Sequence, residues 1–446
     1  MGRPEIVLGL LLLAVILSGC SNEATSTATE PLVLKGSTCS GPWADHCEID
    51  QGQIRISDIE SDAEHETGIR IESPSLPVVL ENIRLDRVSV GVRISDLCGT
   101  CQISVVDAHI GYGSIGLHVD TGPGSPALSL SNVTLLSQPS PARTYGIHYT
   151  GPGGGLDMSD VTIEGQETQP GYAILHEGLG DASLTNVTMM HIQRGIVGKW
   201  PSLVIVNGLI ECGTDAIWTS SDEFSATNLT VRNCLRGAPP CSPQCRYPAI
   251  QIADTVEQLL AGDRAKSFHL KDSSIINNSN QAIYVRPVVS ANLEGVNVVG
   301  NGAGINLFDA NSTVMTRSNI SHNADFGVTL GARQRLDISD TWFYQNGPGP
   351  YQYGGLAIAS PAPTLIRGET EVPELVIRNS AFEGNTPWGI YAGSAPVDAR
   401  FNWWGHIGGP TPHQGKALGP SGQLLGDYVT EMVISKPQLT APPVSG

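Results

Sequence analysis

The sequence predicts an all-β fold, a single-stranded solenoid of parallel β-strands that repeats in about 13–14 coils. Three observations predict it. From residue 54 onward, segments such as "ALSLSNVTLL" (127–136) and "LVIRNSAFEG" (375–384) alternate apolar and polar residues on both sides of a turn residue. Such alternation with period two is typical of strands. A small residue recurs at near-regular spacing, and no sustained helical stripe interrupts the repeat.

The recurring small residue is followed by an apolar, a variable and a mostly apolar residue, as in "GVRI", "GLHV" and "AIYV". It stands at positions 68, 91, 116, 146, 173, 195, 216, 249, 282, 304, 327, 355 and 389. The spacings run from 21 to 34 residues, and the longer ones carry Pro- and Gly-rich insertions. Stacked strands lie about 4.8 Å apart, so equivalent residues of successive coils should form columns along the axis.

Composition narrows the class of protein. The chain has 446 residues, of which 40% are apolar and 15% are charged, and its formal net charge is −18. The apolar content suffices for a continuous core. An acidic surface repels phosphate backbones, so we exclude nucleic acid as a partner and interpret the charge first as a means of staying soluble.

The N-terminus predicts export. Residues 1–19 contain the apolar run "IVLGLLLLAVIL", which is short for a membrane span and typical of a signal peptide. The run ends in "LSGC" (17–20), which resembles the lipobox of bacterial lipoproteins. In that family the peptide is cut before the Cys, so the resemblance implies that Cys20 carries acyl chains. Residues 20–31 would then tether the protein to a membrane of the bacterial cell envelope, with the outer membrane or cell surface as the expected place. A plain export signal or a membrane anchor is the alternative.

Eight further cysteines fall into four close pairs. They are Cys39 with Cys47, Cys98 with Cys101, Cys212 with Cys234, and Cys241 with Cys245. An even number in an exported chain predicts disulfides, because that compartment is oxidising, and pairing between neighbours is the simplest arrangement. "CGTC" (98–101) could also be a redox pair, but no thioredoxin-like βαβ pattern surrounds it.

Two short motifs suggest nucleotide chemistry and are better explained by the repeat. Asp325-Phe326-Gly327 matches the metal-binding triplet of protein kinases, yet no catalytic loop or Lys-bearing strand accompanies it. We therefore place Phe326 and Gly327 in a bend and Val328 in the core. "GYGSIG" (111–116) opens a strand instead of a helix, so no helix dipole awaits a pyrophosphate.

Two Asx columns follow from the repeat. One occupies the turn after the first strand and comprises Asn82, Asp107, Asn132, Asp160, Asn186, Asn207, Asn228, Asp272, Asp340 and Asn379. The other follows the second strand and comprises Asn278, Asn301, Asn323, Asn346 and Asn385. Asx residues tolerate tight turns, and stacked amides satisfy one another's hydrogen bonds. A calcium or sugar site is the sharper alternative, but carboxylates are not clustered, so we predict no metal site.

The outward position of the small-residue strand supplies the candidate ligand-binding residues. Four successive coils place Arg70, Arg93, His118 and His148 there, and Trp218 and Tyr284 follow further along. Like charges so close repel unless an anion is bound or the histidines stay neutral. Arginine suits carboxylates, and the aromatic side chains could stack on sugar rings. The alternative is a solvated face that binds no ligand.

The repeat resembles the right-handed parallel β-helix proteins of the pectate-lyase-like superfamily over about residues 50–430. The most specific match is "DARFNWWGHIGGP" (398–410), similar to an "NWWG…GP" signature that closes many bacterial β-helices, with Phe401 where Asn is frequent. The resemblance implies that Trp403 and Trp404 help cap the last coil. It divides the chain into an N-terminal cap (32–53), the β-helix (54–404) and a C-terminal cap and tail (405–446).

Enzymes of that superfamily depolymerise or epimerise acidic polysaccharides. Their motifs (a paired Asp-Asp, "GHG", "RIK" or "DPHD") are not found, and Asp215, Asp222, Glu223 and Asp254 show no evident cluster. We identify no catalytic residue and predict no cofactor; Ca²⁺ would be expected only for a lyase. Fold does not give function. The sequence therefore predicts a surface lipoprotein that binds carbohydrate. The alternatives are a polysaccharide lyase, glycoside hydrolase or epimerase, and a structural or adhesive spacer.

Overall fold

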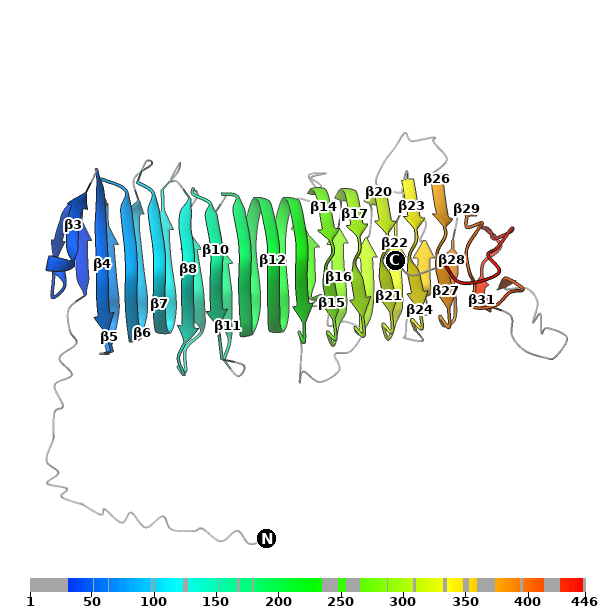
Figure 1. Cartoon of the computed structure of the whole chain (residues 1–446), viewed down its shortest axis with the longest axis horizontal. Helices are drawn as coiled ribbons and strands as arrows, with labels where there is room; N and C mark the ends of the chain where they lie inside the picture. The colour runs from blue at the N-terminus through cyan, green and yellow to red at the C-terminus, as the bar shows by residue number, and fades with distance from the viewer. Residues whose placement is uncertain are drawn as a thin grey trace, which may run out of the picture.

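The computed structural model describes residues 31–443, apart from positions 51, 63, 98, 100, 123–126, 152, 167–168, 179, 235–247, 254–264, 287, 308–309, 332–334, 348–352, 359–373, 394–395 and 413–425. Strands of successive coils lie side by side along the long axis of the molecule, from the blue N-terminal end to the red C-terminal end (Figure 1). Almost every strand pairs in parallel with its counterpart in the next coil. The predicted all-β parallel solenoid is confirmed.

The N-terminal half consists of long strands that bend through the corners of each coil. They are β4 (Gln53–Ser61), β5 (His65–Glu72), β6 (Val78–Leu97), β7 (Ile103–Thr121), β8 (Leu128–Ser137), β9 (Thr144–Thr150), β10 (Leu156–Glu164), β11 (Gly171–His176) and β12 (Ala182–Arg232). Three parallel sheets arise from them. Sheet I precedes the Asx turn, sheet II follows it, and sheet III contains the small-residue repeat.

In the C-terminal half each sheet has separate strands. Sheet I continues through β14 (Ala265–Lys271), β17 (Val288–Glu294), β20 (Ala310–Thr316), β23 (Arg335–Ser339), β26 (Glu374–Arg378), β29 (Val397–Asp398) and β32 (Val433–Ile434). Sheet II continues through β15 (Ser274–Ile276), β18 (Asn297–Val299), β21 (Asn319–Ser321), β24 (Trp342–Tyr344) and β27 (Ala381–Glu383). Sheet III continues through β13 (Ile250–Ala253), β16 (Gln281–Arg286), β19 (Ala303–Leu307), β22 (Phe326–Leu330), β25 (Gly354–Ile358), β28 (Ile390–Ala392) and β31 (Gly426–Val429), with β30 (Pro410–Pro412) beside β31.

Both ends of the rod extend the sheets beyond the segment predicted as the β-helix. At the N-terminal end, β1 (Leu32–Lys35) pairs antiparallel with β2 (Thr38–Ser40) and parallel with β5. A 3-10 helix, η1 (Ala44–His46), leads to β3 (Cys47–Asp50), which pairs antiparallel with β4. At the other end, β31 and β32 continue sheets III and I.

The two tryptophans of the C-terminal signature, Trp403 and Trp404, make different contacts. Trp404 is fully buried and stacks on Phe382 with ring centroids 5.1 Å apart. Trp403 forms a parallel bridge with Ala381, which extends sheet II by one position. Because sheets I and III extend past this coil, these two residues close sheet II while β31 and β32 lie beyond them.

The core is a set of apolar columns instead of a globular centre. One column of sheet I runs from Ile56 through Leu80, Val105, Leu130 and Met158 to Leu184, each directly opposite the next in register. All six side chains are 0–1% exposed. Period-two alternation therefore replaces a globular core with axial rows of Leu, Ile and Val.

The small residue of the repeat is required by the close approach of neighbouring coils in sheet III. A Cβ added to Gly304 would lie 1.9 Å from the carbonyl oxygen of Gly327, its counterpart in the next coil. A Cβ on Gly327 would lie 2.4 Å from the carbonyl oxygen of Gly355. At these coils the repeat requires Gly, because even the Cβ of Ala would meet the carbonyl oxygen of the next coil, and no residue larger than Ala occupies the position in any other coil.

Both Asx columns occur as predicted. All ten turn residues have positive φ, for example 53° at Asn132, whose Nδ2 donates to Asp107 Oδ1 at 2.7 Å. The second column is a buried ladder: Asn323 Nδ2 donates to Asn346 Oδ1 at 3.0 Å, and Asn385 donates in turn to Asp427. Sequence reasoning did not foresee that a carboxylate, Asp427, ends this ladder.

The kinase-like triplet lies in sheet III. Val328 is fully buried, as predicted. Phe326 and Gly327 begin strand β22 and are not in a bend, so that part of the prediction is wrong. Pairing with β25 extends the strand one residue to the N-terminal side of the small residue.

Two of the predicted disulfides are present, Cys39–Cys47 and Cys212–Cys234. Cys101 is also disulfide-bonded. Cys20, Cys98, Cys241 and Cys245 lie outside the described residues. Cys212 and Cys234 are both buried and link neighbouring coils of sheet II.

Candidate functional site

The outward residues predicted for sheet III lie opposite one another in successive coils. Arg70 on β5 is opposite Arg93 on β6, which is opposite His118 on β7, which is opposite His148 on β9. The structure therefore brings these four side chains together over four successive coils. Further along the same column, Trp218 on β12 is opposite Gln251, which is opposite Tyr284 on β16.

A second column, which the sequence interpretation missed, runs beside the first. It consists of the residues that precede the small residue: Tyr145 is opposite Tyr172, and Tyr172 is opposite Arg194. The next coil has Asp215 at this position, before Ala216. The signal was present in "YGIH", "YAIL", "RGIV" and "DAIW", whose first letter stands directly before the small residue with which the repeat pattern begins.

The two columns join into one stack, here called the π ladder, which consists of His118, His148, Tyr145, Tyr172, Arg194 and Trp218. The imidazoles of His118 and His148 stack at 5.2 Å, and His148 stacks on Tyr145 at 4.8 Å. Tyr145 stacks on Tyr172 at 5.5 Å with an interplanar angle of 4°. Arg194 Cζ lies 5.6 Å from the centroid of the Tyr172 ring and 5.3 Å from that of Trp218.

This stacking decides which parts of the side chains are available. Ring faces inside the ladder are turned toward one another, so the solvent meets ring edges and their N–H and O–H groups. Trp218, which is 39% exposed, has the guanidinium of Arg194 against one face. Sugar stacking on ring faces, as predicted from the sequence, is therefore restricted to surfaces that the ladder leaves open, and hydrogen bonding at the edges is favoured.

The surroundings of the two histidines in the ladder favour their neutral form. Burial, then the neighbouring His148, then Arg93 lower the pKa of His118 below 6.5, while Asp120 acts in the opposite direction. Burial also lowers the pKa of His148 below 6.5, and Glu177, whose Oε2 lies 4.0 Å from His148 Nε2, opposes this effect. Neutral imidazoles remove the like-charge cost that the sequence raised.

The two arginines at the N-terminal end of the column differ in their partners. Arg70 Nη1 lies 3.9 Å from Glu72 Oε1 on the same strand. Arg93 is exposed, and no ion pair of Arg93 occurs within the described part of the chain. Arg93 is therefore a cation available to a ligand on a protein that is acidic overall.

Arg194 has a buried carboxylate beneath it. Asp215 Oδ2 lies 3.3 Å from Arg194 Nε, and the Asp215 side chain is 3% exposed. Burial raises the pKa of Asp215 to about 6, although the charge of Arg194 works against this rise. The contact is an ion pair without hydrogen-bond geometry, because Asp215 Oδ2 has no hydrogen-bond partner in the described structure.

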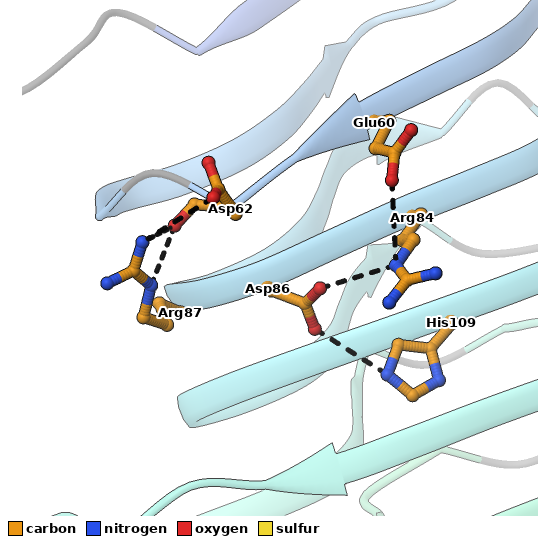
Figure 2. A network of polar contacts seen from close by, with 6 residues as sticks. All are labelled: Glu60, Asp62, Arg84, Asp86, Arg87 and His109. Carbon is orange, nitrogen blue, oxygen red and sulfur yellow. Dashed lines mark hydrogen bonds and ion pairs between the residues drawn. The ribbon is translucent and has the colours of Figure 1, made fainter.

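A different charged cluster, on sheet II, shows what a compensated surface looks like (Figure 2). Arg84 Nε lies 3.4 Å from Asp86 Oδ2 and 3.9 Å from Glu60 Oε1, and His109 Nε2 lies 3.6 Å from Asp86 Oδ1. Arg87 Nε donates to the backbone carbonyl of Asp62 at 2.7 Å. Each cation there has an oxygen partner from its own chain, so this cluster is interpreted as structural.

The carboxylates considered from the sequence do not gather. Asp222 Oδ2 lies 3.7 Å from Lys266 Nζ, which is exposed, whereas Asp215 contacts Arg194 of the π ladder. Asp254 lies outside the described residues. Over the described ranges, no group of three His, Cys, Asp or Glu side chains could hold a metal ion. Within the same ranges, no helix reaches the length and apolarity needed to cross a membrane.

Comparison with known proteins identifies the architecture. Residues 216–402 match the family model described as a right handed beta helix region. The matched segment runs from the last coils of β12 to the end of the "FN" that precedes the two tryptophans. No curated protein and no solved structure matches the chain significantly.

Proposed function

We propose that this chain, a right-handed parallel β-helix protein, binds an anionic carbohydrate along the π ladder and the adjoining Arg70 and Arg93. The observation that carries the proposal is the ladder itself, a continuous row of hydrogen-bond donors on one sheet. Such a row fits a linear ligand better than a compact one, because equivalent positions repeat about every 4.8 Å along the rod.

Local charge supports an anionic ligand. The chain as a whole has a formal net charge of −18, so an acidic polymer would be repelled from most of its surface. Arg93 is exposed on this sheet, and the exposed Arg143 directly precedes β9, with its Cζ 5.7 Å from the centroid of the Tyr172 ring. Arginine forks bind carboxylates and sulfates with two parallel hydrogen bonds, which gives both affinity and orientation.

An array of neutral and anionic glycans tests the proposal. We expect retention of anionic polymers by the wild type and at least a tenfold loss in the Arg93→Ala/His118→Ala double variant, because charged hydrogen bonds contribute about 1.5–3 kcal/mol each. Thr162→Ala is the matched control, since Thr162 is an outward residue of sheet II opposite Thr134 and Thr188. Equal retention by all three proteins would contradict a ligand site on sheet III.

The same polymers separate binding from catalysis. Reducing or unsaturated ends appearing in an incubation with the wild type would identify a polysaccharide hydrolase or lyase, and an inverted uronate would identify an epimerase. Retention without any change in the polymer agrees with a binding protein. No retention and no product from a folded rod would favour a structural or adhesive spacer.

We also propose that the rod is exported and held on the cell envelope through acylated Cys20. The support is the "LSGC" motif at residues 17–20, which resembles a lipobox. Acyl chains would anchor the tether stably, because two or more chains are needed for lasting membrane attachment. Cys20→Ser should abolish labelling with a fatty-acid analogue and move the protein from the membrane fraction. Labelling that persists in the variant would contradict this assignment.

A further inference from the structure

We propose that Arg194 is a pre-oriented site for an oxyanion of the ligand, a carboxylate or a sulfate, and that Asp215 competes with that oxyanion for the guanidinium. This inference rests on the proposed carbohydrate binding and specifies which side chain anchors the charged group. Arg194 was not a candidate from the sequence, and Asp215 was considered there only as one of four carboxylates without an evident cluster.

The guanidinium lies over two aromatic rings. Arg194 Cζ is 5.6 Å from the centroid of the Tyr172 ring on β11 and 5.3 Å from that of the Trp218 ring on β12. Arg194 Nη1 donates a long hydrogen bond of 3.4 Å to the hydroxyl of Tyr172. These contacts restrict the guanidinium before a ligand arrives, which reduces the entropy lost on binding.

Most of its donors remain available. A guanidinium has five N–H groups. In the described structure the hydrogen bond to Tyr172 is the one that Arg194 makes, and its contact with Asp215 at 3.3 Å lacks hydrogen-bond geometry. The side chain of Arg194 is 23% exposed, so part of the fork reaches the surface of sheet III. An oxyanion there would receive the charge-assisted bonds that Asp215 does not take.

Asp215 makes the site sensitive to protonation. Its carboxyl is almost fully buried, and burial raises its pKa to about 6. An oxyanion bound to Arg194 would lie close to the Asp215 carboxylate, and this repulsion disfavours binding while Asp215 is ionised. Protonation of Asp215 removes the repulsion and leaves the charge of Arg194 to the ligand, so affinity rises as pH falls through about 6.

Other charged groups near the π ladder also affect the binding of an anion. Arg143 lies over the same Tyr172 ring and is a second cation beside it. Burial lowers the pKa of His148, and Glu177, 4.0 Å from it, opposes this effect. Protonation of His148 would also favour an anion at low pH. A test must therefore remove Asp215 and His148 separately.

The experiment compares binding of a carboxylated glucan with binding of its carboxyl-reduced form to the full-length protein. At pH 7, Arg194→Lys should weaken binding of the carboxylated polymer by about tenfold or more, since Lys keeps the charge but loses the planar fork. Arg232→Gln is the matched control, because Arg232 also lies on β12 but pairs with Glu211 on sheet II at 3.2 Å. Binding of the carboxylated polymer to Arg194→Lys with wild-type affinity would overturn the proposal.

The pH profile separates competition from a merely structural role. Between pH 7.5 and 5, wild-type affinity for a sulfated glucan, which stays ionised, should rise by several-fold. Asp215→Asn should bind tightly at pH 7.5 and lose most of this dependence, while His148→Gln should lose only the smaller part that is due to His148. A profile in Asp215→Asn equal to that of the wild type would contradict competition between Asp215 and the ligand.

Titration with glucuronate, followed by the NMR signal of Arg194 Nε–H and assigned with Arg194→Lys, makes the two proposals separable. A shift on addition of glucuronate without retention of any polymer would support the oxyanion site and contradict the carbohydrate-binding proposal. Polymer retention that is lost in Arg93→Ala/His118→Ala but unchanged in Arg194→Lys would support the carbohydrate-binding proposal and contradict the oxyanion site at Arg194. No shift of the Arg194 signal at saturating glucuronate or sulfate overturns the oxyanion site.

Discussion

The imidazole rings of His118 and His148 stack with their centroids 5.2 Å apart and their planes 10° apart. They come from successive coils and lie directly opposite each other on β7 and β9. Two protonated rings at this separation would repel, and the neutral form is favoured further by burial, which lowers the pKa of both. This pair is the start of the π ladder.

The pKa of both histidines should fall below 6.5 in an NMR titration. Arg93→Gln should raise the pKa of His118, because the charge of Arg93 is one of the causes that lower it. Glu177→Gln should lower the pKa of His148 further, because Glu177 favours the protonated ring. The ring signals of His322, on sheet II near Tyr344, serve as a reference that neither substitution should move. A lowered pKa of His118 in Arg93→Gln would contradict this electrostatic account.

The buried asparagine ladder should be the most sensitive polar element of the rod. Asn323 is fully buried, donates to Asn346 and to the Val298 carbonyl, and accepts from Asn301. Asn323→Ala leaves several buried polar groups without partners, at about 1–3 kcal/mol each. We therefore expect the free energy of unfolding in urea to fall by about 3 kcal/mol.

Asn306→Ala is the matched control for that substitution. Asn306 lies on β19 in the outward column of sheet III, one coil before Thr329. Its replacement should change stability by no more than about 0.5 kcal/mol, as for most surface positions. Comparable losses in the two variants would show that the ladder has no special role.

The carboxylate that ends the ladder should make the stability of the rod depend on pH. Burial raises the pKa of Asp427 from 3.8 to about 6, against the hydrogen bonds donated by Asn385. The ionised carboxylate is therefore disfavoured in the folded state. The loss of stability caused by ionisation is absent below pH 3.8, develops as the pH rises from 3.8 to about 6, and is complete above about pH 6.

Asp427→Asn removes this cost and keeps an oxygen that can accept from Asn385. Relative to the wild type, the variant should gain about 2 kcal/mol of unfolding free energy at pH 7.5 and much less at pH 4. Urea denaturation at the two pH values measures the difference. If the difference in stability between variant and wild type is the same at both pH values, ionisation of Asp427 does not destabilise the folded state.

The small residue of the repeat gives a fourth test. Gly304→Val would place side-chain carbon against the carbonyl oxygen of Gly327, since even a Cβ would approach to 1.9 Å. Overpacking of this kind costs about 1–3 kcal/mol, and we expect a matching loss of unfolding free energy. Gly113→Ala is the control, because a Cβ there meets nothing closer than 3.7 Å. Equal stability of Gly304→Val and the wild type would contradict the close approach of coils.

Much of this molecule could be read from its sequence. Period-two alternation gives strands, the recurring small residue gives the coil length, and equivalent residues of successive coils must then be neighbours. That reasoning placed Arg70, Arg93, His118 and His148 in one column, and the registers of β5 to β9 agree. It also placed Asn323 and Asn346 in one ladder.

What only the tertiary structure decided is how side chains of different columns meet. Periodicity orders residues along one column, but stacking between columns depends on the turn of each strand and on the rotamers of the side chains. The ladder crosses from His148 to Tyr145 in this way, and Arg194 reaches Asp215 and Trp218 from a coil 21 or more residues earlier. Asp215 appeared isolated in the sequence because its burial and its partner are properties of packing, and these determine both its pKa and its place in the site.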